Sequence, residues 1–436
     1  MGIRSTVLRS AEDRIAQNAL LGRRGLEEAL RNAGGPLVEA ADDGSGDTVI
    51  TFVAIGPKTA PAVRCPIFAA LDWQEAMQLL PGTSDVWWAE ASTPHRALRT
   101  QYRFLSQRID RSAFHRDDEG AELVAAMNAA YELGYPDPFN PRRAYPTSGF
   151  GIDSDLPVDK WDSVLLLPEA ASGLAWGEAH TPVGSLETLE IASSILQNSR
   201  KVTVWEARTN DSTASLPTVV LLDGEDLLHG VDAPRVFDSL VSRHVIPPFR
   251  AVFVHNPTMT SRMTEYPCNP CFRDFVADEL MPVLRARYNL PDDPRLIAIG
   301  GFSYGGLAAT WVAFARPDVF GGVIASSPSM WWGPGVRVSA DPPPEGSPRV
   351  QPEWLTRQYE AAPTKQLRVW IDVGLLEVQE LPFAAGVNML SCCRSFRDVL
   401  VAKGYDLVGY AEQPCGHEYL GWREGLASGL AALFAT

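Results

Sequence analysis

The chain has 436 residues, of which 45% are hydrophobic and 21% charged, so its composition is that of a globular protein rather than a disordered or fibrous one. Its 38 Lys and Arg face 53 Asp and Glu, for a net charge of −15. This charge repels phosphate backbones and anionic lipid, which argues against nucleic-acid and membrane partners.

The N-terminal part of the chain combines helical and β patterns. In the first ~35 residues apolar positions recur every three and four residues, which predicts helix. Four short β runs follow, a spacing typical of a small antiparallel sandwich; they cover residues 48–54, 63–70, 84–90 and 99–106. Four prolines in residues 135–146 exclude regular helix and central strand there, and we interpret the chain from there to about 185 as a connector. We therefore predict a β-rich domain over residues 1–185, with a helical N-terminus and a Pro-rich connector.

The pattern changes near residue 200, where short apolar runs begin to alternate with helical segments. The expected strands are 201–207, 218–223, 251–255, 295–300, 322–326, 368–373 and 407–412, and the expected helices are 233–245, 271–288, 305–316 and 383–403. Strands that are apolar on both faces and alternate with helices predict an α/β domain with a mainly parallel sheet, here over residues 186–436. Residues 333–353 are rich in Pro and Gly, and we expect a surface loop there.

One pentapeptide of this domain carries a recognisable chemistry. Gly301-Phe302-Ser303-Tyr304-Gly305 directly follows an expected strand and opens an expected helix. This is the G-x-S-x-G nucleophile elbow in the context that it requires, and it predicts an α/β-hydrolase catalytic domain. The alternative is a tight turn with a capping serine. We expect Ser303 to be a nucleophile, with its hydroxyl at a helix N-terminus where developing negative charge is favoured.

A serine nucleophile needs a base and an acid, which follow it in this fold in the order Ser, acid, His. His417 is the only histidine after Ser303, and it comes just after the last expected strand. The preceding strand offers two carboxylates. Glu377 lies on the loop beyond Gly374, whereas Asp372 lies within the strand. We predict Glu377 as the acid and keep Asp372 as the alternative.

Backbone N–H groups complete the predicted chemistry. The oxyanion hole is expected to use the N–H of Tyr304, next to the nucleophile, and one from Gly224 or Glu225 after the strand 218–223.

Cysteines and the N-terminus bear on the compartment. The six cysteines are scattered and favour reduced thiols in the cytoplasm, and Cys268 and Cys271 form a lone CxxC that is weak evidence for zinc. The first residues lack the apolar region of a secretory signal. We predict a cytoplasmic protein with no metal and no cofactor.

The sequence also resembles a known family. The segments LLDGEDLLHG, SRMTEYPCNPCFRDFVADELMPVLR, GGFSYGGLAA, SSPSMWW and GHEYLGWREGL, in this order, resemble the enterochelin (enterobactin) esterases. DVWWAEA, YRFL, YPDPFNP and LQNSRKVTVWEA resemble that family's N-terminal domain and its junction to the hydrolase, so the resemblance covers about residues 45–436. It implies cytoplasmic hydrolysis of a small-molecule ester, a catecholate siderophore trilactone that is often bound as its ferric complex.

The resemblance also implies site residues. Ser303, Glu377 and His417 match the family's triad. Arg262, in SRMTE, is expected to bind an anionic ligand, or else to brace the fold by pairing with Glu265.

Two positions depart from the family pattern. Asp226-Leu227-Leu228 stands where an aromatic residue near the pocket is expected, and Cys415 stands where a glycine is more usual. Trp331, Trp332 and Tyr304 are the aromatic residues that can hold a catechol instead.

Three hypotheses remain open at this point. The leading one is a siderophore esterase. The second is a serine esterase for another ester, such as a depsipeptide or a phenolic acyl ester. The third is a hydrolase scaffold that binds a ligand without turnover. The sequence leaves the oligomeric state open.

Overall fold

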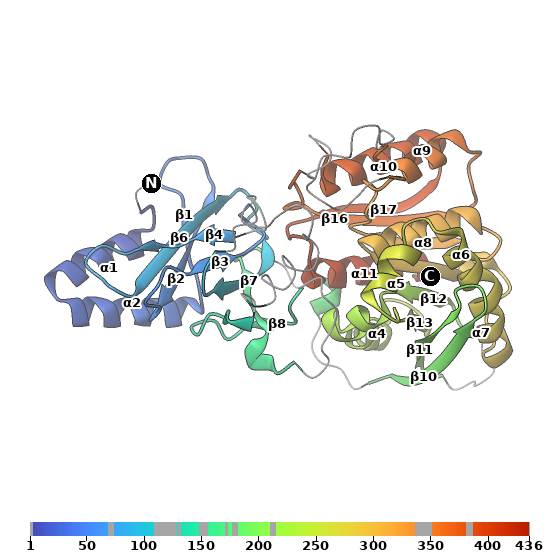
Figure 1. The fold of residues 1–436 in the computed structure, drawn as a ribbon, viewed down its shortest axis with the longest axis horizontal. Coiled ribbons are helices and arrows are strands. Elements are labelled where there is room, and N and C mark those ends of the chain that lie inside the picture. The colour runs from blue at the N-terminus through green and yellow to red at the C-terminus, as the bar shows by residue number, and fades with distance from the viewer. Residues whose placement is uncertain are drawn as a thin grey trace.

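The computed structural model describes residues 3–68, 74–108, 129, 132–147, 156–170, 173–176, 182–209, 215–335, 351–380 and 387–435. These residues form two lobes that lie side by side, with the N-terminal third of the chain in one lobe and the C-terminal part in the other (Figure 1). Among the helices of the described ranges, none is long and apolar enough to cross a membrane.

Two helices open the first lobe, α1 (Thr6–Gln17) and α2 (Ala19–Ala33). The side chains of Ser5 and Asn18 cap them by accepting from backbone N–H groups in the first turn, and Gly34 ends α2 in the left-handed conformation at φ 69°. Their apolar stripes pack with strands β2 and β6 in one hydrophobic cluster. The expected helical N-terminus is therefore present.

The rest of the first lobe is two antiparallel sheets with the strand orders β1-β2-β6-β5 and β4-β3-β7-β9-β8. The strands are β1 (Leu37–Ala40), β2 (Thr48–Ile55), β3 (Ala62–Arg64), β4 (Gln74–Ala76), β5 (Gln78–Leu79), β6 (Val86–Thr93), β7 (Arg99–Leu105), β8 (Arg143–Ala144) and β9 (Asp162–Leu166). One hydrophobic cluster joins both sheets, with Phe52 of β2 against Tyr102 of β7. This arrangement confirms the predicted sandwich-like fold class.

The second lobe contains an eight-stranded sheet in the order β10-β11-β13-β12-β14-β15-β16-β17. Strands β10 and β11 are antiparallel, and the strands from β13 to β17 run parallel. Every residue of β12, β13 and β15 is buried, as expected for strands covered on both faces. The strands are β10 (Gly184–Ser193), β11 (Asn198–Ala207), β12 (Thr218–Leu222), β13 (Arg250–Val254), β14 (Ile297–Phe302), β15 (Gly322–Ser326), β16 (Arg368–Gly374) and β17 (Asp406–Gln413).

Helices cover both faces of this sheet, and their side chains fall into two hydrophobic clusters. On one face lie α4 (Ala233–Ser242) and α11 (Tyr419–Phe434). On the other lie α6 (Pro270–Asp274), α7 (Met281–Arg287), α8 (Tyr304–Ala315), α9 (Trp354–Ala361) and α10 (Met389–Lys403). A short helix, α5 (Met259–Glu265), follows β13. The layered α/β architecture predicted for this part of the chain is confirmed.

Several elements had no clear sequence signal. Strand β10 is an edge strand with mostly exposed residues, so it lacks an apolar run, and β9 lies in the segment expected to be a connector. Helix α11 has glycines every four residues, which lowers helix propensity, yet a Cβ on Gly425 would lie 2.2 Å from Asp372 and one on Gly429 2.8 Å from Ile324. The glycines let α11 pack close to the sheet. Residues 69–70, 336–350 and 383–386, which belong to an expected strand, loop and helix, lie outside the described residues.

Candidate active site

Ser303 occupies the sharp turn between β14 and α8. Its backbone has φ 54° and ψ −124°, an unusual conformation for a non-glycine residue. A Cβ on Gly301 would lie 2.6 Å from the backbone carbon of Gly305, so the turn requires glycine at this position. The strand–turn–helix geometry therefore follows the expected elbow and places the Ser303 side chain at the N-terminus of α8.

Three side chains meet at the carboxyl ends of the parallel strands. Ser303 follows β14, Glu377 lies three residues beyond the end of β16, and His417 lies in the loop after β17. His417 Nε2 is 3.1 Å from Ser303 Oγ, and His417 Nδ1 is 2.7 Å from Glu377 Oε2. The Glu377 side chain is 2% exposed and that of His417 is 24% exposed. The chain of contacts thus runs from a buried carboxylate to a half-buried serine that solvent can reach.

The two candidate acids, Asp372 within β16 and Glu377 just beyond its end, have different surroundings. Glu377 Oε1 accepts hydrogen bonds from Gly374 N at 2.8 Å and from Ser327 Oγ at 2.6 Å, while its other oxygen contacts His417. Asp372 instead accepts from Ser326, Trp370 and Gln413. The structure therefore brings Glu377 rather than Asp372 to the histidine.

Burial sets the protonation of the second carboxyl. Asp372 is 1% exposed, and burial raises the pKa of its side chain to about 7. Asp372 sits within the sheet, beneath α11, where a Cβ on Gly425 would collide with its oxygens. A strand residue points into a sheet face, which is why its side chain is directed at the covering helix and not at the open edge.

Two residues that the sequence did not single out support the triad positions. Ser327 donates to Glu377 and accepts from Trp422 Nε1 at 3.1 Å. The Trp422 ring stacks on Phe302 at a centroid distance of 4.0 Å and lies edge-on to His417 at 4.8 Å. Both residues stand in segments, SSPSMWW and GHEYLGWREGL, that carried the family resemblance, but their contacts arise between strands and helices far apart in the chain.

The expected oxyanion donors lie at two strand ends. Tyr304 is the first residue of α8, and the first N–H groups of an α-helix have no acceptor within it. Gly224 follows β12 so closely against β13 that a Cβ would lie 3.0 Å from the backbone carbons of Phe253 and Val254. The Glu225 carboxylate contacts His255 Nδ1 at 3.3 Å.

Arg262 pairs with Asp223 and not with Glu265. Its Nε and Nη2 donate to the two oxygens of Asp223, at 2.7 and 2.8 Å. Burial alone would lower the pKa of Arg262, but the Asp223 carboxylate raises it above its ordinary value. The alternative pairing with Glu265 is wrong, because Glu265 accepts from Arg200 at 2.8 Å instead.

The aromatic residues near the elbow differ in exposure. Trp331 is 7% exposed and packs against Tyr304 with ring centroids 5.6 Å apart. Trp332 is half-buried and lies edge-on to Trp354. Asp226, at the position that departs from the family pattern, accepts from Tyr419 Oη, and burial together with Asp223 raises the pKa of Asp226 to about 6.

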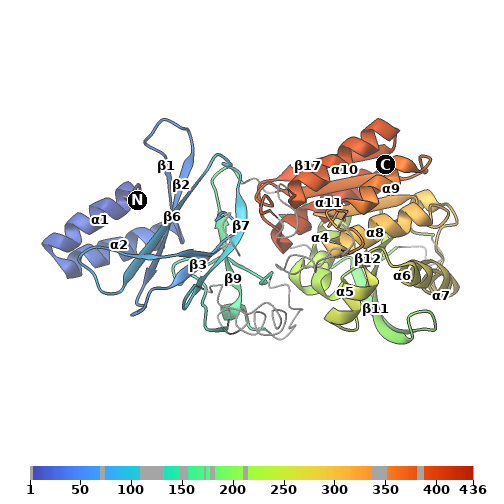
Figure 2. The same cartoon turned by 45° about the horizontal axis from the view of Figure 1, so that its top comes forward.

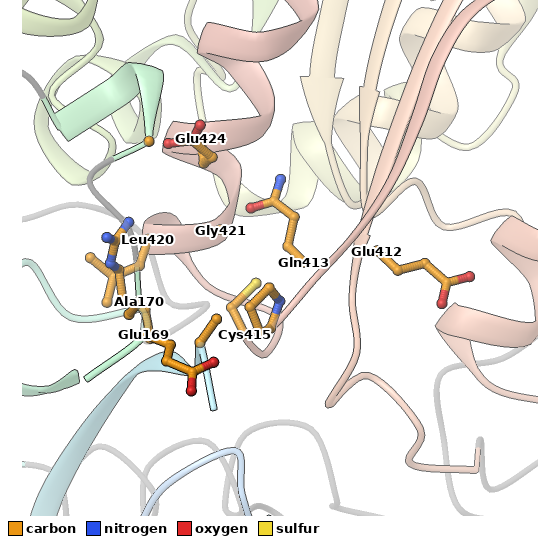
Figure 3. A pocket seen from close by; sticks show the side chains of 12 residues that line it. Glu169, Ala170, Glu412, Gln413, Cys415, Leu420, Gly421 and Glu424 are labelled. Atoms are coloured by element: carbon orange, nitrogen blue, oxygen red, sulfur yellow. The ribbon is translucent and has the colours of Figure 1, made fainter. Parts of the chain in front are cut away.

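A cavity of about 290 Å³ lies near the histidine loop, between the two lobes. Its lining includes Gln413, Cys415, Leu420 and Glu424 of the second lobe and Glu169 and Ala170 of the first (Figure 3). Ser303, Glu377 and His417 are not among the described residues that line this cavity. It is therefore separate from the triad, although Cys415 is only two residues from His417.

Within the described residues, no group of three or more His, Cys, Asp or Glu side chains is placed to hold a metal ion. Cys268 and Cys271 are both free thiols, the first buried and the second exposed.

The chain is similar to known enterobactin esterases. The chain is 27% identical over 366 residues to an iron(III) enterobactin esterase of Escherichia coli, covering 82% of each chain. It is 26% identical over 428 residues to the iron(III) enterobactin esterase of Dickeya dadantii, covering 92% of this chain and 91% of the relative. These matches confirm the resemblance to the enterobactin esterases.

Solved structures show the same fold. The ferric enterobactin esterase of Salmonella typhimurium matches with a TM-score of 0.72 at 22% identity, over 93% of this chain and 98% of that chain. The enterobactin esterase of Shigella flexneri, solved in the presence of enterobactin, matches with a TM-score of 0.68 at 24% identity, over 92% and 96% of the two chains. The family described as "Putative esterase" matches residues 193–433, more than half of the sequence. The chain therefore belongs to this esterase family.

Proposed function

We propose that this protein is a serine esterase that hydrolyses the ester bonds of a catecholate siderophore trilactone, with bound iron as cargo of the substrate. The observation that carries the proposal is the contact chain from Ser303 Oγ through His417 to Glu377. It lies at the carboxyl ends of the parallel strands, where α/β folds place their ligands. The enterobactin esterases that align with nearly the whole chain supply the substrate class.

In the proposed mechanism, Ser303 Oγ attacks the ester carbonyl carbon while His417 Nε2 accepts the hydroxyl proton. Glu377 accepts a hydrogen bond from Nδ1–H, which fixes the imidazole tautomer and stabilises the imidazolium. The C–O bond to the leaving alcohol then breaks, and His417 returns the proton to that oxygen. Water, activated by the same imidazole, hydrolyses the acyl-enzyme and regenerates Ser303.

Backbone donors stabilise the negative charge that develops on the carbonyl oxygen. We assign this role to the N–H of Tyr304 and to one N–H from Gly224 or Glu225. The support is the position of Tyr304 at the start of α8 and of Gly224 against β13. Removing one such donor typically costs about 100- to 1,000-fold in kcat.

Substrate recognition is assigned to Arg262, Trp331 and Trp332. Arg262 already neutralises the buried Asp223, so its main effect is to keep a carboxylate beside the elbow from repelling an anionic substrate. Trp332 is half-buried and can offer a ring face to a catechol, whereas Trp331 shapes the wall behind Tyr304. We place the reaction in the cytoplasm, because all six cysteines are free thiols, as in reducing compartments.

One observation favours a second substrate class. Asp226 occupies the position where an aromatic residue is expected, and burial, together with the nearby Asp223 carboxylate, raises its pKa to about 6. A carboxyl here favours a less anionic ester than a ferric tris-catecholate. A phenolic acyl ester or a depsipeptide is the second candidate for the same triad.

Purified protein incubated with ferric and iron-free enterobactin, followed by chromatography, tests the proposal, with Ser303→Ala as control. We expect stepwise release of dihydroxybenzoylserine by the wild type and a loss of at least about 10,000-fold in the variant. Cleavage of aryl esters without release from either form of enterobactin would replace the siderophore by the second substrate class. Full activity of Ser303→Ala would overturn the mechanism.

A further inference from the structure

The loop that carries His417 belongs to the second lobe, yet the residues around it contact the first lobe. Strand β7 provides two of these contacts. Arg99 N donates to Pro414 O at 2.9 Å, and Gln101 N donates to the Glu418 carboxylate at 2.7 Å. Alternate N–H groups of an antiparallel strand point to the same edge, so Arg99 and Gln101 present a pair of donors. Strand β3 pairs with β7 only from Arg103 onward. The N–H groups of Arg99 and Gln101 lie before this pairing and bond to the loop instead.

Two more contacts join the loop to the first lobe. Tyr419 N, just after it, donates to Thr147 Oγ1 at 3.1 Å. Gly416 packs so tightly on the first lobe that a Cβ would lie 2.4 Å from Cβ of Pro66. His417 is therefore bracketed on both sides by residues held from the other lobe. Figures 1 and 2 show β7 on the side of the first lobe that faces α11.

Glu418 is the side chain that joins these contacts. It is 2% exposed, one oxygen accepts from Gln101 N, and the other accepts from Gly416 N at 3.0 Å. Its carboxyl thus links the strand of one lobe to the backbone on the N-terminal side of His417, while its own backbone adjoins His417 on the other side. A buried carboxyl that joins two backbone segments fixes their distance, because losing either bond leaves an unsatisfied polar group.

We propose that the N-terminal lobe is part of the catalytic site, and that Glu418 is a positioning residue through which β7 sets the place of the His417 imidazole. This inference rests on the proposed role of His417 as general base. The imidazole must lie within hydrogen-bond reach of both Ser303 and Glu377, and a displacement of about 1 Å can cost about 100-fold in rate. Glu418 touches neither substrate nor reacting atoms and acts only through His417.

The chain offers a matched control on the same helix. Glu424 also accepts two backbone N–H groups from an earlier part of the chain, Leu174 N at 3.0 Å and Ala175 N at 3.3 Å. It lies seven residues beyond His417, further along α11. Glu418→Ala and Glu424→Ala therefore remove comparable bonds, and only the first removes the link beside the histidine.

The test measures kcat and KM with p-nitrophenyl acetate, a small activated ester, normalised to active sites titrated with a fluorophosphonate. We expect Glu418→Ala to lower kcat by about 30-fold or more, with KM within about two-fold. Glu418→Gln keeps one acceptor and is expected to lose about 5- to 10-fold. Glu424→Ala is expected to keep kcat within about two-fold at a comparable loss in melting temperature.

A second variant approaches the same loop from the other lobe and keeps the test decisive if Glu418→Ala does not fold. Thr147→Val keeps the shape of the side chain but removes the acceptor for Tyr419 N, and we expect kcat to fall about three-fold without a change in KM. The proposal is overturned if Glu418→Ala, or Thr147→Val in its place, matches Glu424→Ala in kcat. A wild type that cleaves p-nitrophenyl acetate through Ser303 but no trilactone overturns only the substrate assignment. A wild type that cleaves neither ester overturns both proposals.

Discussion

The turn that carries Ser303 and the loop that carries His417 reach the same site by different means. The turn at Ser303 is shaped by its neighbours in sequence, with strand β14 before it, helix α8 after it, and the close approach of Gly301 to Gly305. Backbone hydrogen bonds to Ser326 and Ser329, fewer than 30 positions away, complete it. The His417 loop is fixed by residues more than 300 positions away, such as Gln101. The difference teaches that the turn of a proposed nucleophile can be encoded locally, whereas the position of its proposed base depends on how two lobes pack.

The largest expected loss of kcat follows from removing either Ser303 or His417. Ser303→Ala and His417→Ala should each lower kcat on the natural ester by about 10,000-fold or more, because either loss removes the activated nucleophile. The double variant should be no slower than the slower single variant, since the two groups act as one unit. Steady-state kinetics of the three proteins test this. Additive losses would contradict a shared role.

The next largest loss of activity distinguishes Glu377, beyond the end of β16, from Asp372 within the strand. Glu377→Gln should lower kcat by about 100- to 10,000-fold, because an amide does not hold the same imidazole tautomer. Asp372→Asn should stay within about three-fold, since Asp372 bonds to Ser326, Trp370 and Gln413. Kinetic measurements at one pH compare the pair directly. The reverse ranking would make Asp372 the acid of the triad.

A pair of glycine variants sharpens the contrast between local and long-range positioning. Gly301→Ala places a Cβ 2.6 Å from the Gly305 backbone, and Gly416→Ala places one 2.4 Å from Pro66 of the other lobe. Overpacking of this kind costs about 1–3 kcal/mol. We expect Gly301→Ala to lower stability and kcat together. Gly416→Ala should lower kcat about ten-fold with the smaller loss of stability, as measured by thermal unfolding and kinetics side by side.

The smallest expected effect is a change in the free energy of unfolding with pH, caused by the titration of Asp372. Burial raises the pKa of Asp372 to about 7 in the folded protein, above its ordinary value of 3.8. The folded state therefore binds more protons than the unfolded state between about pH 4 and 7, and this contribution to stability is lost as the pH rises through that window.

Asp372→Asn removes that titration. The stability difference between wild type and variant, from urea unfolding at pH 5 and pH 8, should shift by at least about 1 kcal/mol, with the wild type relatively weaker at pH 8. An unchanged difference would mean that Asp372 is ionised at both pH values. Glu377→Gln is not a suitable control because it alters the active site, so Asp406→Asn, at the exposed start of β17, serves instead.

Much of the fold was predictable because its signals are local. The apolar runs of β11 to β17 and the elbow around Ser303 can be read from neighbouring residues, since buried parallel strands and a strand–turn–helix both impose composition over a few positions. Strand β10 and helix α11 could not be read in this way. Strand β10 is a polar edge strand. Helix α11 contains glycines, which lower its helix propensity but let it pack close to the sheet.

The sequence by itself determined which groups this protein offers for the proposed chemistry: a serine at an elbow, one histidine after it and an acid past a strand end. The tertiary structure decided which carboxyl meets the histidine, that Arg262 pairs with Asp223, and that β7 of the N-terminal lobe grips the loop around His417. The physical reason is the separation along the chain over which each interaction acts. Backbone conformation and strand burial act between neighbours in the chain, whereas a hydrogen bond such as that from Gln101 to Glu418 joins residues that only the folded chain brings together.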